Sequence, residues 1–257
     1  MTKMNTDDEK TRQANLAGEE IEELTTDDLI LSAHVGKNSE VFPKVLELHV
    51  EKGTKVADIT YGKGVFWKDV PQNAFELHAT DLDPEKSPDS DEGVDCRDLP
   101  YEDNTFDCVV FDPPYAEGFY RRNKDMLAGG GSHNSFREAY SNGEVVDTNG
   151  TKYHGAVQDV YFGGGAEARR VLKEDGTFIV KTQDEVSANT QELTHVQIIN
   201  FYEQELGFYT KDLFILVRSN TPHQTGMYNQ VHARKNHSYF LVFTLERDPV
   251  NYPLKDD

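Results

Sequence analysis

The chain has 257 residues and a formal net charge of −20, from 46 acidic and 26 basic side chains. This length is sufficient for one large domain with a substantial core. The sequence contains no run of eighteen apolar residues, and its first thirty residues are polar and acidic. These features argue against a membrane span or a secretory leader and predict a soluble, cytoplasmic protein.

The net charge argues at first sight against a polyanionic partner, because phosphates are bound by lysine and arginine. The acidic residues are unevenly distributed, however: residues 1–28 contain nine acidic and three basic side chains, and a second acidic cluster spans residues 81–103. A neutral or basic face elsewhere would still allow nucleic acid to bind. We expect residues 1–28 to be a disordered acidic tail and residues 29–257 to form one domain.

Two cysteines, Cys96 and Cys108, are present, and neither belongs to a CxxC or Cys/His spacing. The histidines between residues 218 and 238 lack the i, i+4 spacing of a helical zinc site. The sequence therefore predicts reduced cysteines in the core and no metal ion.

The first predicted elements lead into a glycine turn. A helix is expected to begin near Phe42-Pro43 and to end before Gly53, and residues 55–60 are expected to form a strand. This strand runs directly into Gly62-Lys63-Gly64 and a predicted helix. Glycines let a cofactor approach the backbone, and a helix N-terminus offers free N–H groups. A G-x-G turn by itself is common, and its position after an apolar strand ending at Asp58 strengthens the signal.

Further strands are expected to end in acidic turns. Residues 75–80 form a predicted strand followed by Asp81, nineteen residues after Gly62, where a carboxylate can bind ribose hydroxyls. Asp83 is an alternative, and either acid can instead be a solvated turn residue. Residues 93–100, which contain Asp95, form a third predicted strand and turn.

Residues 108–111 form a buried strand that the sequence Asp112-Pro113-Pro114-Tyr115 ends, because two prolines continue neither a ladder nor a helix. Ligands bind beyond the carboxyl ends of strands in open α/β sheets, so Asp112 and Tyr115 are expected at the mouth of a site. The alternative is an ordinary Asp-Pro turn.

Two segments lack periodicity and are the predicted substrate-recognition loops. Residues 116–156 are rich in Gly, Ser, Asn and Arg, and a stretch of this length indicates a lid, a binding loop or a plain surface insertion. Residues 218–238 are polar and basic.

The remaining residues alternate between helices and strands. We expect helices over residues 157–172 and 191–206, with Gly163-Gly164-Gly165 interrupting or starting the first and Asp175-Gly176 closing it. Residues 177–182 form a strand, and an antiparallel pair is expected over residues 213–217 and 239–243.

Taken in order, these segments resemble the S-adenosylmethionine-dependent amino-methyltransferases of nucleic acids, over roughly residues 29–245. The cofactor motif of that family reads approximately D-x-F-x-G-x-G, and residues 58–64 read D-I-T-Y-G-K-G, with Thr60 in place of Phe. The order of the two motifs is similar to the γ-like subgroup. The resemblance implies a Rossmann-like methyltransferase sheet, mostly parallel with an antiparallel final strand, and helices on both faces.

The resemblance also implies an S-adenosylmethionine site. In that family the segment from His34 to Leu46 closes over the methionine end of the cofactor, Asp81 binds the ribose, and Asp95 binds the adenine amine. The implied cofactor residues are His34, Phe42, Asp58, Thr60, Gly62, Gly64, Asp81, Asp95 and Cys96.

The resemblance assigns catalysis to Asp112, Pro113, Pro114 and Tyr115. Asp112 and the Pro113 carbonyl would hold the N–H groups of an exocyclic amine, and Tyr115 would stack on the extruded base. Asp in the first position is more typical of adenine-N6 than of cytosine-N4 enzymes. The expected function is therefore methylation of adenine N6 in DNA. The expected substrate-binding residues are Tyr115, Arg121, Arg122, Lys124, Arg234 and Lys235.

Other functions are compatible with the same motifs. RNA adenine-N6 and guanine-N2 methyltransferases share the motif, and protein glutamine methyltransferases normally begin it with Asn. A non-catalytic protein that keeps the fold is a further alternative, suggested by the net charge of −20. The sequence favours DNA as the partner, allows RNA, and leaves the oligomeric state open.

Overall fold

The computed structural model describes residues 29–116, 153–219 and 229–245. The chain divides into a short N-terminal unit, Met1–Leu31, and a large unit, Ser32–Asp257, which contains every described helix and strand. The predicted acidic tail and almost all of the predicted insertion at 116–156 lie outside the described residues.

The large unit is built on a seven-stranded sheet with the order β1-β8-β9-β5-β4-β2-β3. Its strands are β1 (Ala33–Val35), β2 (Lys55–Asp58), β3 (Glu76–Ala79), β4 (Phe106–Phe111), β5 (Leu172–Thr182), β8 (Tyr209–Val217) and β9 (His237–Thr244). All neighbours are parallel except β9, which is antiparallel to both β5 and β8. The predicted Rossmann-like sheet with an antiparallel final strand is confirmed.

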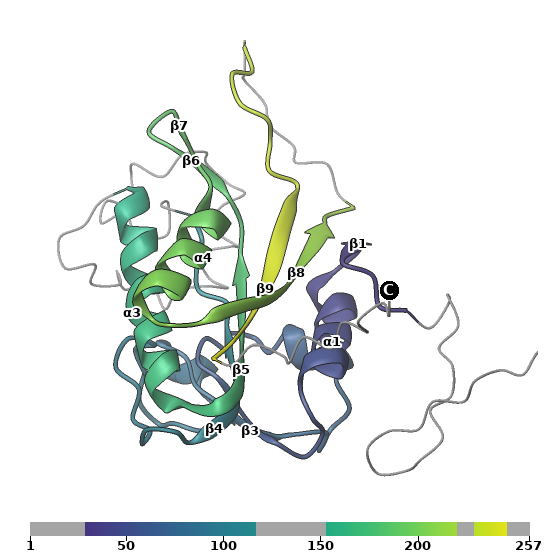
Figure 1. Cartoon of the computed structure of the whole chain (residues 1–257), viewed down its shortest axis with the longest axis vertical. Helices are drawn as coiled ribbons and strands as arrows, with labels where there is room; N and C mark the ends of the chain where they lie inside the picture. The colour runs from purple at the N-terminus through teal and green to yellow at the C-terminus, as the bar shows by residue number, and fades with distance from the viewer. Residues whose placement is uncertain (1–28, 117–152, 220–228, 246–257) are drawn as a thin grey trace, which may run out of the picture. The chain divides into compact units, whose positions relative to one another are not determined.

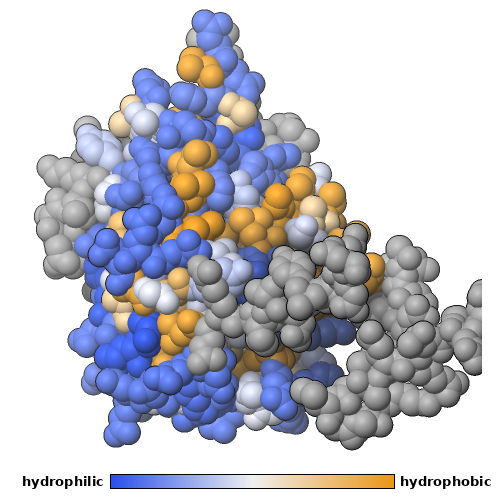
Figure 2. Space-filling view, viewed as in Figure 1, coloured by the Kyte–Doolittle hydropathy of each residue, from blue (hydrophilic) through white to orange (hydrophobic). Residues whose placement is uncertain are grey.

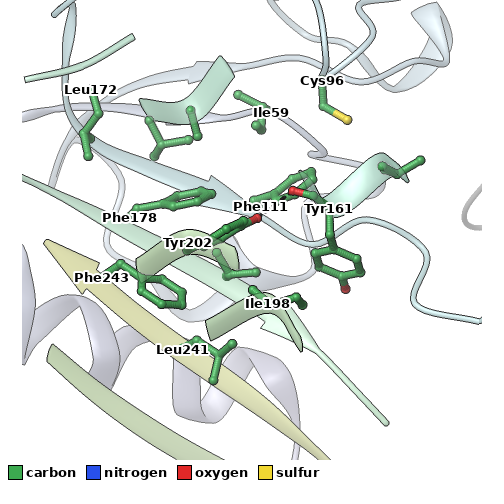
Figure 3. Packing of buried hydrophobic residues seen from close by; sticks show 14 of the residues in the cluster. Ile59, Cys96, Phe111, Tyr161, Leu172, Phe178, Ile198, Tyr202, Leu241 and Phe243 are labelled. Atoms are coloured by element: carbon green, nitrogen blue, oxygen red, sulfur yellow. Dashed lines mark hydrogen bonds between the residues drawn. The ribbon is translucent and has the colours of Figure 1, made fainter. Parts of the chain in front are cut away.

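Helices cover both faces of this sheet, as predicted (Figure 1). Helices α3 (His154–Val171) and α4 (Thr194–Glu205) lie on one face, and α1 (Asn38–His49) lies on the other. On the α3 side the ring of Phe111 packs 5.6 Å from that of Tyr161, within the aromatic and aliphatic cluster drawn in Figure 3. On the α1 side the ring of Phe42 lies 6.1 Å from that of Phe240. Burial of both apolar faces holds the layers together.

The three glycines of α3 neither interrupt nor start the helix, so that prediction is wrong. Each lies against a side chain from another segment that comes too close for a Cβ. A Cβ on Gly164 would lie 2.5 Å from the Phe111 ring, and one on Gly165 would lie 2.4 Å from the Tyr202 ring. The gain from packing the helix against the sheet outweighs the low helix propensity of glycine.

Asp175-Gly176 does not close this helix. Helix α3 ends at Val171, and both residues lie inside β5, where the register with β4 shifts between the pairs Phe106–Leu172 and Cys108–Thr177. Extra residues on β5 form a bulge there, which is a common place for glycine in a strand.

The third predicted strand, at residues 93–100, is absent from the described sheet. Asp95 instead accepts a hydrogen bond from the backbone N–H of Arg97, and the N–H of Asp98 donates to the carbonyl of Asp95. Such local bonds compete with ladder formation and leave the segment as turns.

The helix expected after the glycine turn is reduced to a single short turn. The turn is followed by η2 (Phe66–Asp69), a 3-10 helix of four residues, so no extended helix presents its N-terminus to a ligand. A second short 3-10 helix, η3 (Pro84–Lys86), follows Asp83.

Several elements begin earlier or lie where none was expected. Helix α1 begins at Asn38, which places Pro43 inside it, and Gly53 lies beyond its end with a positive φ of 82°. The edge strand β1 and the hairpin of β6 (Glu185–Ser187) and β7 (Thr190–Glu192) were not predicted. These strands have three residues each, too few for a periodic signal.

Hydrophilic residues cover most of the face shown in Figure 2, with apolar patches between them. This distribution agrees with the high content of charged residues. Among the described helices, none is both long and apolar enough to cross a membrane.

Candidate cofactor and methyl-transfer site

A pocket of about 140 Å³ lies at the carboxyl ends of β2, β3 and β4. It brings together six predicted cofactor residues and the first part of the predicted catalytic motif. The lining residues from these sets are Asp58, Thr60, Gly62, Asp81, Asp95, Cys96, Asp112, Pro113 and Pro114. In open α/β sheets this is the edge beyond which ligands bind.

The carboxylate of Asp58 forms hydrogen bonds with residues on both sides of the glycine turn. One carboxylate oxygen accepts the backbone N–H of Thr60 at 3.1 Å, and the other accepts the indole N–H of Trp67 at 2.7 Å. Asp58 is only 3 % exposed, and this burial raises its pKa to about 7. Asp58 therefore connects the strand end, the turn and η2.

Asp81 holds the other side of the turn. Its carboxylate accepts the backbone N–H of Gly62 at 2.9 Å and that of Asp83 at 2.9 Å. Gly62 has a φ of 58°, a conformation that glycine adopts without strain. Asp83, the alternative to Asp81, caps η3 and pairs with Lys86, and it is absent from the pocket lining. The geometry favours Asp81 as the carboxylate that faces a ligand.

Asp95 enters the pocket from the turn that replaces the third strand. It forms a two-pronged ion pair with Arg97, whose Nε and Nη2 donate to separate carboxylate oxygens at 3.0 and 2.7 Å. Burial opposes ionisation, but the bonds from Arg97 prevail and lower the pKa of Asp95. Arg97 also donates to Asp159 of α3 at 2.7 Å, so the acid is tied to the helix layer.

Asp112 joins the catalytic motif to the cofactor motif. Its backbone N–H donates to the hydroxyl of Thr60 at 2.7 Å, which makes Thr60 a direct connection between the two motifs. The Oδ1 atom of Asp112 is enclosed and has no hydrogen-bond partner within the described part of the chain. Burial raises the pKa of Asp112 to about 7, against the opposing effect of Lys181. An unpartnered buried acceptor is costly unless a ligand supplies a donor.

Tyr115 lies half-buried after the two prolines, and its hydroxyl accepts a hydrogen bond from Arg218 at 2.6 Å. The same Arg218 nitrogen donates to the side chain of Gln183 at 3.1 Å. Arg218 and Gln183 follow the ends of β8 and β5, so two further strands support the aromatic ring. Gln183 was not predicted from the sequence, and Arg218 begins the predicted recognition loop 218–238 without having been singled out in it.

Three predicted cofactor residues lie outside the pocket lining. Phe42 is fully buried between α1 and the sheet, His34 stacks against Phe214 on the edge of the sheet, and Gly64 packs against Tyr61. The segment from residue 34 to 46 does reach the pocket, but through Asn38, the first residue of α1. The apolar residues of α1 lie on one face of the helix, and Phe42 belongs to that face. This pattern favours a core position for Phe42 over contact with a ligand.

The predicted substrate residues are only partly described. Arg234 is exposed, and Lys235 donates from its ammonium to Gln191 of β7. Arg121, Arg122 and Lys124 lie outside the described residues, as do most residues of the insertion. Cys96 and Cys108 are buried and unpaired as expected. No group of three or more His, Cys, Asp or Glu residues suited to a metal ion occurs in the described ranges.

The composition of the pocket fits S-adenosylmethionine. Carboxylates at Asp81 and Asp95 suit hydroxyl and amine donors, and apolar side chains at Ile59, Val94 and Cys96 suit a flat ring. The acidic groups also favour a cationic ligand over a phosphate. The short 3-10 helix after the glycine turn agrees with this, because a phosphate site normally uses the N-terminus of a longer helix. When bound, this cofactor supplies an electrophilic methyl group.

The sheet, the glycine turn and the acids at its carboxyl edge define a methyltransferase fold with a nucleoside-type cofactor site. Residues 106–256, more than half of the chain, match the family model N6_N4_Mtase, described as DNA methylase. The chain belongs to this DNA methylase family and is an S-adenosylmethionine-dependent methyltransferase. The matched segment begins at β4 and therefore includes Asp112 to Tyr115.

The solved structures that match this chain have low sequence identity to it. The PH0226 protein from Pyrococcus horikoshii OT3 is 18% identical, with 80% of this chain and 88% of that chain covered and a TM-score of 0.44. A TehB-like S-adenosylmethionine-dependent methyltransferase from Corynebacterium glutamicum is 14% identical, with coverages of 79% and 86% and a TM-score of 0.43.

A DNA methyltransferase also occurs among these structures. The PvuII enzyme, described as cytosine-N4-specific, is 12% identical, with 60% of this chain and 48% of that chain covered and a TM-score of 0.39. No curated protein sequence matches the chain significantly.

Proposed function

We propose that this chain transfers a methyl group from S-adenosylmethionine to the exocyclic N6 amine of adenine in DNA. The observation that carries the proposal is the enclosed Oδ1 atom of Asp112, which lacks a hydrogen-bond partner among the described residues and borders the cofactor pocket. An amine N–H is the donor that this acceptor needs.

The chemistry of an exocyclic amine explains the role of Asp112. The lone pair of such an amine is delocalised into the ring, which makes the nitrogen a poor nucleophile. Asp112 accepts one N–H and the Pro113 carbonyl accepts the other, which draws the nitrogen toward a tetrahedral geometry. The bond from Asp112 N–H to Thr60 keeps this acceptor in place beside the pocket.

Tyr115 is the proposed stacking partner of the base. A base inside a duplex is out of reach, so it must leave the stack and find an aromatic surface. The bond between Arg218 and the Tyr115 hydroxyl orients the ring, and the exposed guanidinium adds positive charge at the mouth of the site. Positive charge there suits the phosphates that flank an extruded nucleotide.

The choice of adenine depends on Asp112, because Asp at this position is more typical of adenine-N6 members. The decisive experiment incubates the protein with labelled cofactor and unmethylated DNA, then identifies the modified nucleoside by mass spectrometry. We expect N6-methyladenine. N4-methylcytosine would keep the DNA substrate and change the base, and label found in RNA alone would change the polymer.

The variant Asp112→Ala tests the site itself. We expect the transfer rate to fall by about 10²-fold or more, because the acceptor for the amine is removed. Cofactor affinity is expected to change far less than the rate, measured through the emission of Trp67, the single tryptophan, which bonds to Asp58. Asp91→Ala is the control, since Asp91 is an exposed acid outside the pocket. A variant as active as the wild type would refute the assignment of Asp112.

A further inference from the structure

Lys181 is a buried cation next to the proposed site. It lies on β5, is only 2 % exposed, and its Nζ donates to the hydroxyl of Ser238 at 2.6 Å. The same nitrogen lies 4.2 Å from the centre of the Phe240 ring. A hydroxyl and an aromatic face compensate an ammonium only in part, so a buried lysine here needs a further reason.

Lys181 is aligned with Asp112 by the register of the sheet. Strands β4 and β5 are parallel, and Phe111, the last residue of β4, pairs with Val180, so Asp112 and Lys181 are the residues that directly follow this pair. Phe111 and Val180 both pack in the core under α3 and α4. Because side chains alternate along a strand, Lys181 turns to the other face of β5, where its Nζ meets Phe240, and Asp112 lines the pocket just beyond the end of β4.

We propose that Lys181 is a positioning residue that favours the ionised form of Asp112, the form in which both carboxylate oxygens can accept an N–H bond from the substrate amine. The inference rests on the proposed function, because it explains how that acceptor is maintained. Without a cation nearby, a buried carboxyl group is neutral at pH 7 and donates a hydrogen bond instead of accepting one.

The charged groups around the pair agree with this role. Burial and the charge of Asp58 raise the pKa of Asp112, whereas Lys181 and Arg218 lower it, with the result near 7. Burial and Arg218 lower the pKa of Lys181, and Asp112 raises it, also to about 7. Ser238 and Phe240, which contact Lys181 from β9, carry no charge. Removal of the ammonium therefore leaves Asp112 with a higher pKa.

The first test measures this effect without turnover. Carboxyl carbons are titrated by NMR in the cofactor-free protein, and Asp112 is assigned by comparison with Asp112→Asn. In Lys181→Met we expect Asp112 to bind its proton about tenfold more tightly or more, and in Lys181→Arg we expect little change. Lys173→Met is the matched control, because Lys173 lies on the same strand and pairs with Asp107 instead.

The second test follows the transfer rate as a function of pH. We expect Lys181→Met to lose at least about tenfold in kcat near pH 7 and to regain activity at higher pH, where Asp112 ionises again. KM for the cofactor should stay at the wild-type value, and Lys181→Arg should keep the wild-type dependence of kcat on pH. Lys181→Gln repeats the test in case the Met variant fails to fold, which circular dichroism would reveal.

The two tests separate failure of the inference from failure of the proposed function. An unchanged proton affinity of Asp112 in Lys181→Met, or a loss of rate equal at every pH, would overturn the role of Lys181. A wild-type protein that methylates no base would overturn the proposed function, and the NMR titration would still decide the electrostatic pairing.

Discussion

Single residues of the site carry more than one task, and Asp58 is the clearest case. The family motif predicts its position, but its contacts show a structural role, since it holds both Thr60 and Trp67. Thr60 in turn accepts the backbone N–H of Asp112. A substitution at Asp58 is therefore expected to affect both the pocket and the catalytic motif.

Ionisation of Asp58 should make stability depend on pH. Its folded pKa of about 7 exceeds the ordinary value of 3.8, so the folded state binds the proton more tightly. The stabilisation is complete below the ordinary pKa and is lost as the pH rises through about 7. We expect the free energy of unfolding to fall between pH 5 and 8, and Asp58→Asn to reduce that fall by about 2 kcal/mol.

Urea unfolding at several pH values provides the measurement. Asp83→Asn is the control, because the bond from Lys86 lowers the pKa of Asp83, and its contribution is lost only at acidic pH. Asp83→Asn should change the free energy of unfolding by the same amount at every pH between 5 and 8. A slope for Asp58→Asn equal to that of the wild type would contradict the prediction.

At the scale of elements, helix α3 shows how close packing overrides local propensity. Three consecutive glycines weaken an isolated helix, yet Phe111 of the sheet and Tyr202 of α4 leave no room for side chains at Gly164 and Gly165. The same helix carries Asp159, which binds Arg97 and so helps to position Asp95 at the pocket. Close approach of α3 to the sheet thus serves the cofactor site.

Substitution of these glycines tests that interpretation. Gly164→Ala should destabilise the protein by about 1 to 3 kcal/mol, because the clash with Phe111 outweighs the gain in helix propensity. Gln204→Ala on the exposed surface of α4 is the control and should change stability by less than about 0.5 kcal/mol. Denaturant unfolding measures both, and a stabilised Gly164→Ala would show that the layers can separate at little cost.

At the scale of the whole molecule, charge is the feature least suited to the proposed partner. Residues 1–28 contribute nine acidic and three basic side chains, so their removal changes the formal net charge from −20 to −14. Repulsion of DNA acts over the Debye length, which shrinks from about 14 Å to about 4 Å as the ionic strength rises from about 0.05 M to about 0.5 M.

Deletion of residues 1–28 should therefore tighten binding of duplex DNA several-fold at low salt and have little effect at high salt. Fluorescence anisotropy of labelled DNA measures the affinity, and the emission of Trp67 checks that cofactor binding is unchanged. Equal affinities at low salt would mean that the charge of this segment does not reach the DNA-binding surface.

The motifs and most strands of the sheet that holds them could be predicted from the sequence. Apolar runs predicted strands β2 to β5, β8 and β9, and the order of Asp58, Asp81 and Asp112 along them placed acids at one edge, because parallel strands end together. These predictions depend on neighbours in sequence, which periodicity and turn residues encode directly.

Contacts between segments that are far apart in the chain could not be predicted from the sequence. In the sequence, Lys181 is one residue of a predicted apolar strand. Its position beside Asp112 follows from the register of β4 and β5, which joins residues far apart in the chain. The same holds for Arg218 on Tyr115, and for the glycines of α3, whose role depends on Phe111 and Tyr202. Such contacts arise from the packing of layers, and no local pattern specifies which side chains the layers bring together.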